Sequence, residues 1–440
     1  MTEIQISPIE SIKREVERQA GKVRSAIAVT GMVRKTPLPA GEGGEVADAV
    51  GKERALDERF ERGAMFRIIK RMRKKRTATI IKEEKEVWNK RLHAAGEISG
   101  DLRRNLDVLN RQYYSPEYMQ FVGVEVLGED VEIPVRRYSL KSKDLAESDG
   151  QSEPPIVIIG GATSGPTVTK STAEAFALQY PRRDVYVIGY PDSNQSKISE
   201  DLPEKLNDHG NLATYTKINK DVLLKMGFEK FDLVGISMGG GIVLQAVTDT
   251  EFAKRINNLI AISPTNIQKT ETRTKFSLDF GKEILYSRMH PRQWLRVPQV
   301  QPGYTLGSHK GMGLAVSGEI SRHKSLSADD FAGIHVQGRV IIATGRDDAL
   351  ISCKQIRKET ASANKLRMTT GKKPIEFMQV DGAHHSLGDV YAAGIVALVR
   401  NTETMPNKIS VKDVLLTTAE VLVAEHSKLS FTAPYIIKNP

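Results

Sequence analysis

Short apolar runs recur along the chain between residues 156 and 382, and this recurrence limits the possible folds more than any other feature. The runs are rich in Val and Ile and are bounded by Gly, Pro or charged residues, a pattern typical of strands buried on both faces of a parallel sheet. They are IVIIGG (156–161), DVYVIGY (184–190), FDLVGIS (231–237), NNLIAIS (257–263), GRVIIATG (338–345) and IEFMQVDG (375–382). Stretches of helical character separate or follow them, at 167–180, 211–227, 239–250, 352–364 and 386–401. Such an alternation predicts a three-layer α/β domain with a mostly parallel sheet.

A different pattern precedes these runs. From about residue 117 the chain alternates apolar and polar side chains in MQFVGVEVLG and VEIPVRRYSL, on either side of Glu129 and Asp130. Period-two alternation in two adjacent segments predicts a β-hairpin.

The remaining composition divides the chain into regions. We expect a basic, helical N-terminal extension over 1–115, with a Pro- and Gly-rich linker at 36–51. The α/β domain is expected over 116–405, and a C-terminal helix and tail over 406–440. Residues 264–337 separate two predicted strands by far more than the usual ~2–6 residues. They are interpreted as a lid or cap over the site, or alternatively as a surface excursion unrelated to substrate.

Composition excludes some classes of protein. The sequence has no run of ~18 uncharged apolar residues that could span a membrane. The N-terminal segment lacks the apolar core of a secretory signal peptide. Cys353 is the single cysteine, so an internal disulfide is impossible and a cytoplasmic location is expected.

The net charge of +10 raises the question of an anionic partner. Lys and Arg cluster most tightly within residues 67–76, beside an apolar stripe that includes Phe66 and Ile69. This segment could bind an anionic membrane surface or nucleic acid. The alternative is a solvated charged helix or arm, which is the commoner meaning of a charge run.

The sequence Gly235-Ile236-Ser237-Met238-Gly239 carries the strongest chemical signal. It follows an apolar strand directly and precedes a helical segment directly. A serine on such a tight strand-to-helix turn is lifted out of the sheet, and the following amide, that of Met238, lies at a helix N-terminus. Ser237 is therefore the predicted nucleophile.

In these residues, and in the order of nucleophile, acid and histidine, the chain resembles the α/β-hydrolase superfamily over about 117–403. The resemblance implies an oxyanion hole formed by the backbone amides of Ala162 and Met238. Ala162 is the third residue of Gly160-Gly161-Ala162, which stands where the family has a His-Gly-x turn. Gly160 replaces the family's histidine, which leaves the backbone donor in place.

The same resemblance assigns the base and the acid. Gly382-Ala383-His384-His385-Ser386 is similar to the family's Gly-x-x-His-Ser turn, which makes His385 the base and leaves His384 as the alternative. After the preceding strand, the family's Gly-x-x-Asp turn selects Asp348, with Asp347 as the alternative. A serine hydroxyl is a poor nucleophile until an imidazole takes its proton, and a buried carboxylate holds that imidazole in one tautomer.

The sequence thus predicts a serine hydrolase that cleaves a carboxylic ester or a related acyl bond through an acyl-Ser237 intermediate. No cofactor is needed, and no His or Cys pair has the spacing of a metal site. Lipase, thioesterase, amidase and acyltransferase activities remain open, because a fold says little about substrate. The alternative is a weakly catalytic or non-catalytic binding module that residues 67–76 target to membrane or nucleic acid. The oligomeric state stays undetermined.

Overall fold

The computed structural model describes the chain from residue 105 to residue 410, with gaps. The continuous stretches are 115–140, 153–162, 170–193, 196–267, 320–385 and 405–410, and shorter pieces are 105, 108–109, 111–113, 166, 271–272, 274–276, 278–279, 283, 395–396 and 398–399. The predicted basic segment 67–76 and most of the predicted extension lie outside the described residues, as do the linker at 36–51 and the tail after 410.

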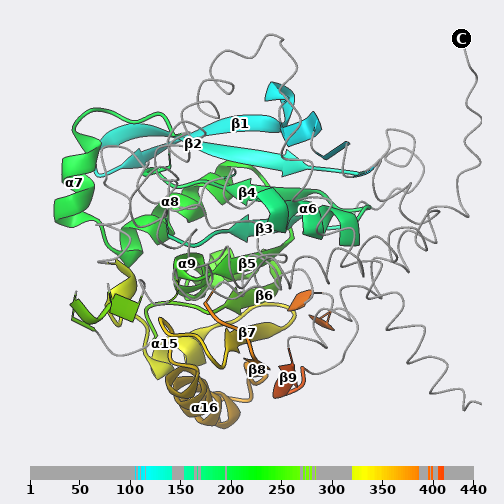
Figure 1. Cartoon of the computed structure of the whole chain (residues 1–440), viewed down its shortest axis with the longest axis vertical. Helices are drawn as coiled ribbons and strands as arrows, with labels where there is room; N and C mark the ends of the chain where they lie inside the picture. The colour runs from blue at the N-terminus through cyan, green and yellow to red at the C-terminus, as the bar shows by residue number, and fades with distance from the viewer. Residues whose placement is uncertain are drawn as a thin grey trace, which may run out of the picture.

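All the predicted strands are present, and they form one nine-stranded sheet in the order β1-β2-β4-β3-β5-β6-β7-β8-β9. β1 and β2 run antiparallel, β2 pairs antiparallel with β4, and every pair from β4 and β3 through to β9 is parallel. Figure 1 shows the strands succeeding one another from β1 at the top to β9 at the bottom. Their bounds are β1 Met119–Val126, β2 Glu129–Tyr138, β3 Ile156–Ile159, β4 Val185–Ile188, β5 Phe231–Ile236, β6 Ile256–Ile262, β7 Val340–Gly345, β8 Glu376–Asp381 and β9 Lys408–Ser410.

Helices cover both faces of this sheet and make the fold a three-layer α/β structure. Alternate residues of one strand enter two separate apolar clusters: in β3, Val157 and Ile159 join one cluster, and Ile156 and Ile158 join the other. The first cluster receives residues of α7, α8, α9, α10, α15 and α16. The second receives residues of α6, the helical residues 395–396 and 398–399, and the helical residues Leu109 and Tyr113. The helices are α6 Lys170–Gln179, α7 Leu202–His209, α8 Leu212–Lys225, α9 Met238–Ala246, α10 Thr250–Ala253, α15 Ala328–Gly333 and α16 Cys353–Thr369; a 3-10 turn, η1, spans Pro116–Tyr118.

Local sequence explains where several of these helices begin. At α8, the Asn211 side chain accepts a hydrogen bond from the Thr214 amide while the Thr214 side chain accepts one from the Asn211 amide. Ser352 likewise caps α16 by accepting from the amide of Gln355. Each cap supplies an acceptor for an amide that the helix itself leaves unpaired.

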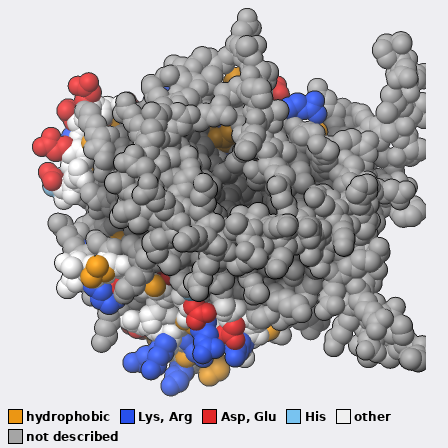
Figure 2. All heavy atoms as spheres, viewed as in Figure 1, with side chains coloured by type: hydrophobic (Ala, Val, Ile, Leu, Met, Phe, Trp, Pro, Cys, Tyr) orange, Lys and Arg blue, Asp and Glu red, His pale blue; other side chains and the backbone are white. Residues whose placement is uncertain are grey.

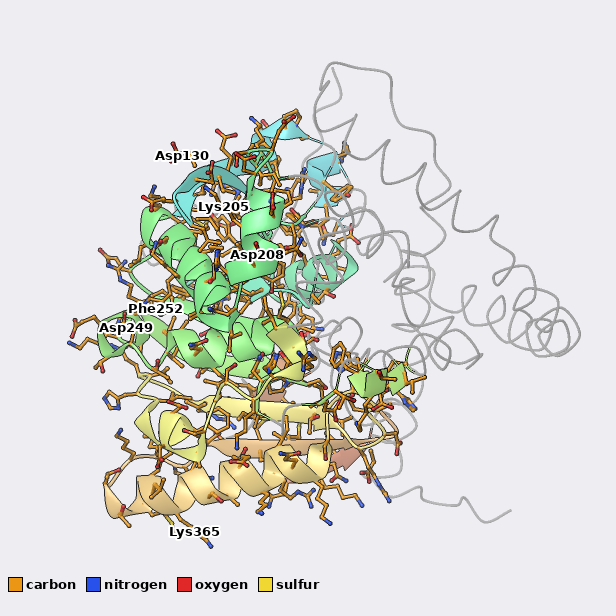
Figure 3. All side chains as sticks on the ribbon, turned by 90° about the vertical axis from the view of Figure 1, so that its left-hand side faces the viewer. Asp130, Lys205, Asp208, Asp249, Phe252 and Lys365 are labelled. Atoms are coloured by element: carbon orange, nitrogen blue, oxygen red, sulfur yellow. The ribbon has the colours of Figure 1, made fainter. Side chains whose placement is uncertain are left out.

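The hairpin turn differs from its expected position. β1 and β2 are joined by Leu127 and Gly128, both with positive φ (52° and 81°), and Val126 is in register with Glu129. Glu129 and Asp130, between the two predicted segments, are instead the first residues of β2. A two-residue turn with positive φ at both positions matches the twist of the strands, and glycine makes it accessible. At this end of the sheet Lys205 of α7 pairs with Glu129, and Figure 3 shows Lys205 and Asp208 on α7 below the end of the hairpin.

The predicted region boundaries need correction. The predicted end of the α/β domain at residue 405 is too early, because Lys408–Ser410 forms β9 and pairs with β8. The predicted extension also ends inside the domain: Leu109 and Tyr113 are buried in its second cluster, and Gln112 hydrogen-bonds with Ser139.

The predicted lid at 264–337 is likewise only partly separate from the core. From residue 320 its described side chains, including Ile320 and Phe331, pack into the first cluster, and α15 lies against α16. This part of the insert therefore belongs to the helical layer that covers one face of the sheet. Residues 284–319 lie outside the described residues.

The described surface is strongly basic along α16. Figure 2 shows Lys and Arg side chains gathered at the lower end of the molecule, where α16 lies. The exposed ones are Lys354, Arg357, Lys358 and Lys365. Within the stretches whose structure is described, no helix is both long enough and apolar enough to cross a bilayer.

Candidate active site

Ser237 lies between β5 and α9 in a backbone conformation that non-glycine residues rarely adopt. Its φ is 56° and its ψ is −117°, and α9 begins at the next residue, Met238. The Ser237 amide continues the ladder with β6 by donating to the carbonyl oxygen of Ile262 (2.8 Å). A non-glycine residue in this region of backbone space costs of order 1–3 kcal/mol, and such strain persists only where its surroundings hold it.

The flanking glycines allow the close packing that holds Ser237 in this conformation. A Cβ on Gly239 would lie 2.2 Å from the carbonyl oxygen of Ile159 and 2.3 Å from that of Gly160. A Cβ on Gly235 would lie 2.4 Å from the carbonyl oxygen of Gly239. Both positions therefore require glycine, and the Gly-x-Ser-x-Gly spacing follows from the close packing of β5, α9 and the end of β3.

Three side chains that the sequence predicted as a catalytic set come together here. The Oγ of Ser237 lies 2.8 Å from Nε2 of His385. The Nδ1 of the same imidazole lies 3.0 Å from Oδ2 and 3.2 Å from Oδ1 of Asp348. The Asp348 side chain is fully buried, whereas 15% of the His385 side chain is exposed. The Asp348 end of this set is therefore closed to water, whereas Ser237 and His385 are partly exposed.

The two alternative residues, Asp347 and His384, make different contacts from Asp348 and His385. Asp348 Oδ1 accepts hydrogen bonds from the amides of Leu350 (3.0 Å) and Ile351 (2.8 Å), which fixes the carboxylate in its turn. Asp347 is exposed, and its amide donates to the carbonyl oxygen of Ala383 (3.1 Å). His384 is mostly buried and points its Nδ1 toward Glu283, at 3.9 Å from Oε1.

The loops after β7 and β8 approach closely enough to hold this geometry. A Cβ on Gly345, the last residue of β7, would lie 2.3 Å from the carbonyl oxygen of Ala383. The Arg346 amide donates to the carbonyl oxygen of Val380 (3.0 Å), and Gly382 turns the β8 loop with a φ of 76°. Asp348 and His385 thus lie in loops that backbone contacts hold together at the ends of the neighbouring parallel strands β7 and β8.

The predicted oxyanion-hole residues lie at the same edge of the sheet. β3 and β5 are adjacent and parallel, with Ile159 opposite Gly235, so the turn after β3 reaches the start of α9. The carbonyl oxygen of Gly160 accepts from the amide of Gly239 (3.1 Å) and from the hydroxyl of Tyr190 (2.6 Å). Ala162 is partly buried two residues further on, and Met238 is the first residue of α9, whose amide has no acceptor within the helix.

Two polar residues of this site carry no sequence motif. Tyr190 follows β4, is fully buried, and holds the Gly160 turn. Glu283 comes from the predicted lid, and its side chain is only 7% exposed. Glu283 Oε1 accepts from the amide of Ala349 (2.6 Å), and Oε2 accepts from the amide of His385 (3.2 Å). Burial raises the pKa of the Glu283 carboxyl above its ordinary value, against the opposing effect of His385.

Other candidates are not part of this constellation. Cys353 is the buried first residue of α16 with its Sγ 3.5 Å from Oε1 of Gln379, and burial raises the pKa of its thiol. Among the residues whose placement is described, no group of three or more His, Cys, Asp and Glu side chains could hold a metal ion.

Known proteins provide a comparison for the fold. Residues 154–304 match the sequence family described as the alpha/beta hydrolase fold. No curated protein matches the chain.

Among solved structures, a bromoperoxidase from Bacillus anthracis is 14% identical, with a TM-score of 0.45, and the alignment covers 64% of this chain and 99% of that one. An esterase from Thermogutta terrifontis is 12% identical, with a TM-score of 0.44 and coverage of 64% and 97%. A carboxylesterase from Bacillus subtilis is 14% identical, with a TM-score of 0.41 and coverage of 68% and 96%. These likenesses carry no conclusion about the substrate of this chain.

The family match spans the strand, turn and helix around Ser237, and the sheet that surrounds this turn has the parallel order described above. On this evidence the chain has the α/β-hydrolase fold, and residues 154–304 are similar in sequence to the family of that description.

Proposed function

We propose that the protein is a serine hydrolase that cleaves carboxylic esters through an acyl-Ser237 intermediate. The observation that carries this proposal is the continuous chain of contacts from Ser237 Oγ to His385 Nε2 (2.8 Å) and from His385 Nδ1 to Asp348 (3.0 Å). A hydroxyl, an imidazole and a buried carboxylate in this order form the unit that activates a serine in many unrelated hydrolases.

In the first half of the reaction, Ser237 Oγ attacks the ester carbonyl carbon while His385 Nε2 takes the hydroxyl proton. The carbonyl oxygen becomes an oxyanion, for which the amides of Met238 and Ala162 are the proposed donors. The bond to the leaving alcohol then breaks, and the imidazolium gives its proton to the leaving oxygen. Each oxyanion donor of this kind is worth about 3–4 kcal/mol of activation free energy.

In the second half, a water molecule gives its proton to His385 and attacks the acyl carbon. The acid product leaves, and the proton returns to Ser237. Asp348 holds the imidazole in the tautomer that keeps Nδ1 protonated, so that Nε2 faces the serine, and it stabilises the imidazolium. An acyltransferase would differ only in using an alcohol or amine in place of this water.

The test is labelling of the folded protein with a fluorophosphonate, which phosphonylates an activated serine. We expect the wild type to label, Ser237→Ala not to label, and His385→Ala to label far more slowly. p-Nitrophenyl esters of increasing acyl length then measure the substrate range. If the folded wild type neither labels nor cleaves any ester, the proposal is wrong and a non-catalytic role replaces it.

A further inference from the structure

Glu283 connects the two loops that carry the acid and the base. Its two carboxylate oxygens each accept one backbone amide, Oε1 from Ala349 in the β7 loop and Oε2 from His385 in the β8 loop. Ala349 directly follows Asp348, and His385 is the base itself. A closed ring of contacts therefore runs from Asp348 through the His385 imidazole and backbone to Glu283, and through the Ala349 amide back to the Asp348 turn.

Three consecutive backbone amides in the turn after Asp348 each donate to a carboxylate oxygen. The amides of Leu350 and Ile351 bond Asp348, and the amide of Ala349 bonds Glu283. Two buried carboxylates thus share three consecutive amides, which fixes the turn from both sides. Hydrogen bonds to charged acceptors in such surroundings are stronger than those between neutral groups.

The charge of Glu283 also acts on the imidazole. The ionisable groups that face Glu283 among the described residues are His384 and His385 from the β8 loop and Asp348 from the β7 loop. Because Glu283 is buried, its field is weakly screened by solvent. A second carboxylate close to His385 stabilises the protonated imidazole more than the neutral one.

We propose that Glu283 is a positioning residue, which clamps the Asp348 and His385 loops at one spacing and favours the imidazolium that forms during acyl transfer. The inference rests on the proposed function, in which His385 is the base. It gives the insert at 264–337 a part in the chemistry, because the carboxylate that closes the ring comes from this insert.

Glu283→Gln removes the charge and places an amide group against a backbone donor, so it tests both roles. With substrate, we expect kcat/KM to fall about 10- to 100-fold, since small misplacements of catalytic groups have effects of this size. The acid limb of the kcat/KM profile should also move to lower pH, because the imidazole then loses its proton more readily. Glu271→Gln is the matched control: Glu271 lies in the same insert, and its carboxylate pairs with Lys275.

A second measurement does not depend on turnover. In protein labelled with nitrogen-15 at histidine, the titration of His385 is followed by NMR and assigned by comparison with His385→Asn. We expect its midpoint to fall by about 1 pH unit in Glu283→Gln and to stay unchanged in Glu271→Gln. Glu283→Asp, which keeps the charge but is too short to reach both amides, should retain the wild-type midpoint and still lose rate.

The outcomes separate the two proposals. A shifted midpoint in a protein whose serine never labels would retain the effect of Glu283 on the His385 imidazole and refute the ester hydrolase. An unchanged midpoint of the His385 titration in Glu283→Gln would overturn the inference and leave Glu283 as a structural residue only. This holds whether or not kcat/KM falls. Circular dichroism and thermal unfolding of each variant show that the comparison is made between folded proteins.

Discussion

The hydroxyl of Tyr190 donates a hydrogen bond of 2.6 Å to the carbonyl oxygen of Gly160. This oxygen also accepts the amide of Gly239, so the turn after β3 is held by a residue of the β4 end and by the helix that follows Ser237. Burial raises the pKa of Tyr190 well above its ordinary value, which keeps the hydroxyl protonated and able to donate. The proposed oxyanion turn is thus anchored from two sides.

Tyr190→Phe removes one of these anchors and leaves the ring in place. We expect the free energy of unfolding to fall by about 1 kcal/mol, the typical net value of one hydrogen bond. The kcat/KM for an ester should fall by less than the roughly 100-fold that loss of a direct oxyanion donor costs. Urea unfolding and steady-state kinetics measure the two effects. Tyr186→Phe in β4 is the control: this half-buried tyrosine packs its ring at a tilt of 54° against Phe228, and its variant should leave kcat/KM unchanged. Equal losses of kcat/KM in both variants would contradict the role of Tyr190.

Asp348→Asn tests the choice between the two neighbouring acids. An amide cannot stabilise the imidazolium, and it favours the wrong tautomer of His385, so we expect kcat to fall by up to about 10,000-fold. Asp347→Asn changes an exposed neighbour and should retain nearly full activity. The rate of fluorophosphonate labelling compares the two variants directly. A larger loss in Asp347→Asn would exchange their assignments.

Gly239→Ala tests the packing that holds the strained serine. Its Cβ would lie 2.2 Å from the carbonyl oxygen of Ile159, so β3 and α9 must separate to admit it. Overpacking of this kind costs typically 1–3 kcal/mol of stability, and the displaced turn should also reduce labelling of Ser237. Gly123→Ala in β1 adds the same methyl group where nothing lies within 4 Å, and it should change neither property. Wild-type behaviour of Gly239→Ala would mean that the turn is not held by this contact.

The raised pKa of Glu283 predicts how the stability depends on pH. A carboxyl group that binds its proton more tightly in the folded protein contributes stability that is largest below its ordinary pKa of about 4.5 and decreases as the pH rises through its folded value. The free energy of unfolding of the wild type, relative to Glu283→Gln, should therefore decrease as the pH rises above about 4.5. Urea titrations of both proteins over this range measure it. A difference that stays constant or increases with pH would show that the pKa is not raised.

Local sequence predicted much of this fold because its strands are buried on both faces. Ile156–Ile159 is a fully buried apolar run, and Phe231–Ile236 is buried throughout and has one charged residue, Asp232, which pairs with Arg183. Such runs differ clearly from the helical stretches between them. β9 was missed because Lys408–Ser410 has three residues, of which one is apolar, and its pairing with β8 is a tertiary event. α7 was missed because its sequence LPEKLNDH is mostly polar and buries only Leu202 and Leu206.

The site could be predicted to the extent that its residues follow strands in recognisable turns. Ser237, Asp348 and His385 stand at the carboxyl ends of β5, β7 and β8, where motif and position agree. Tyr190 and Glu283 have no such motif. Glu283 is one acidic residue among several in a long insert, and only its contacts with Ala349 and His385 distinguish it. Contacts between segments this far apart in the chain leave no local pattern in the sequence.

The short strand β9 has a practical consequence for handling the protein. It pairs with β8 at Gln379, Val380 and Asp381, the segment that leads into the His385 loop. A truncated form that ends at residue 405 would leave these backbone groups without their partners and make the longer strand β8 the edge of the sheet, a template on which other chains can add strands. Shortened versions intended for crystallisation should therefore keep Ser410, or they will tend to aggregate for reasons unrelated to the chemistry of Ser237.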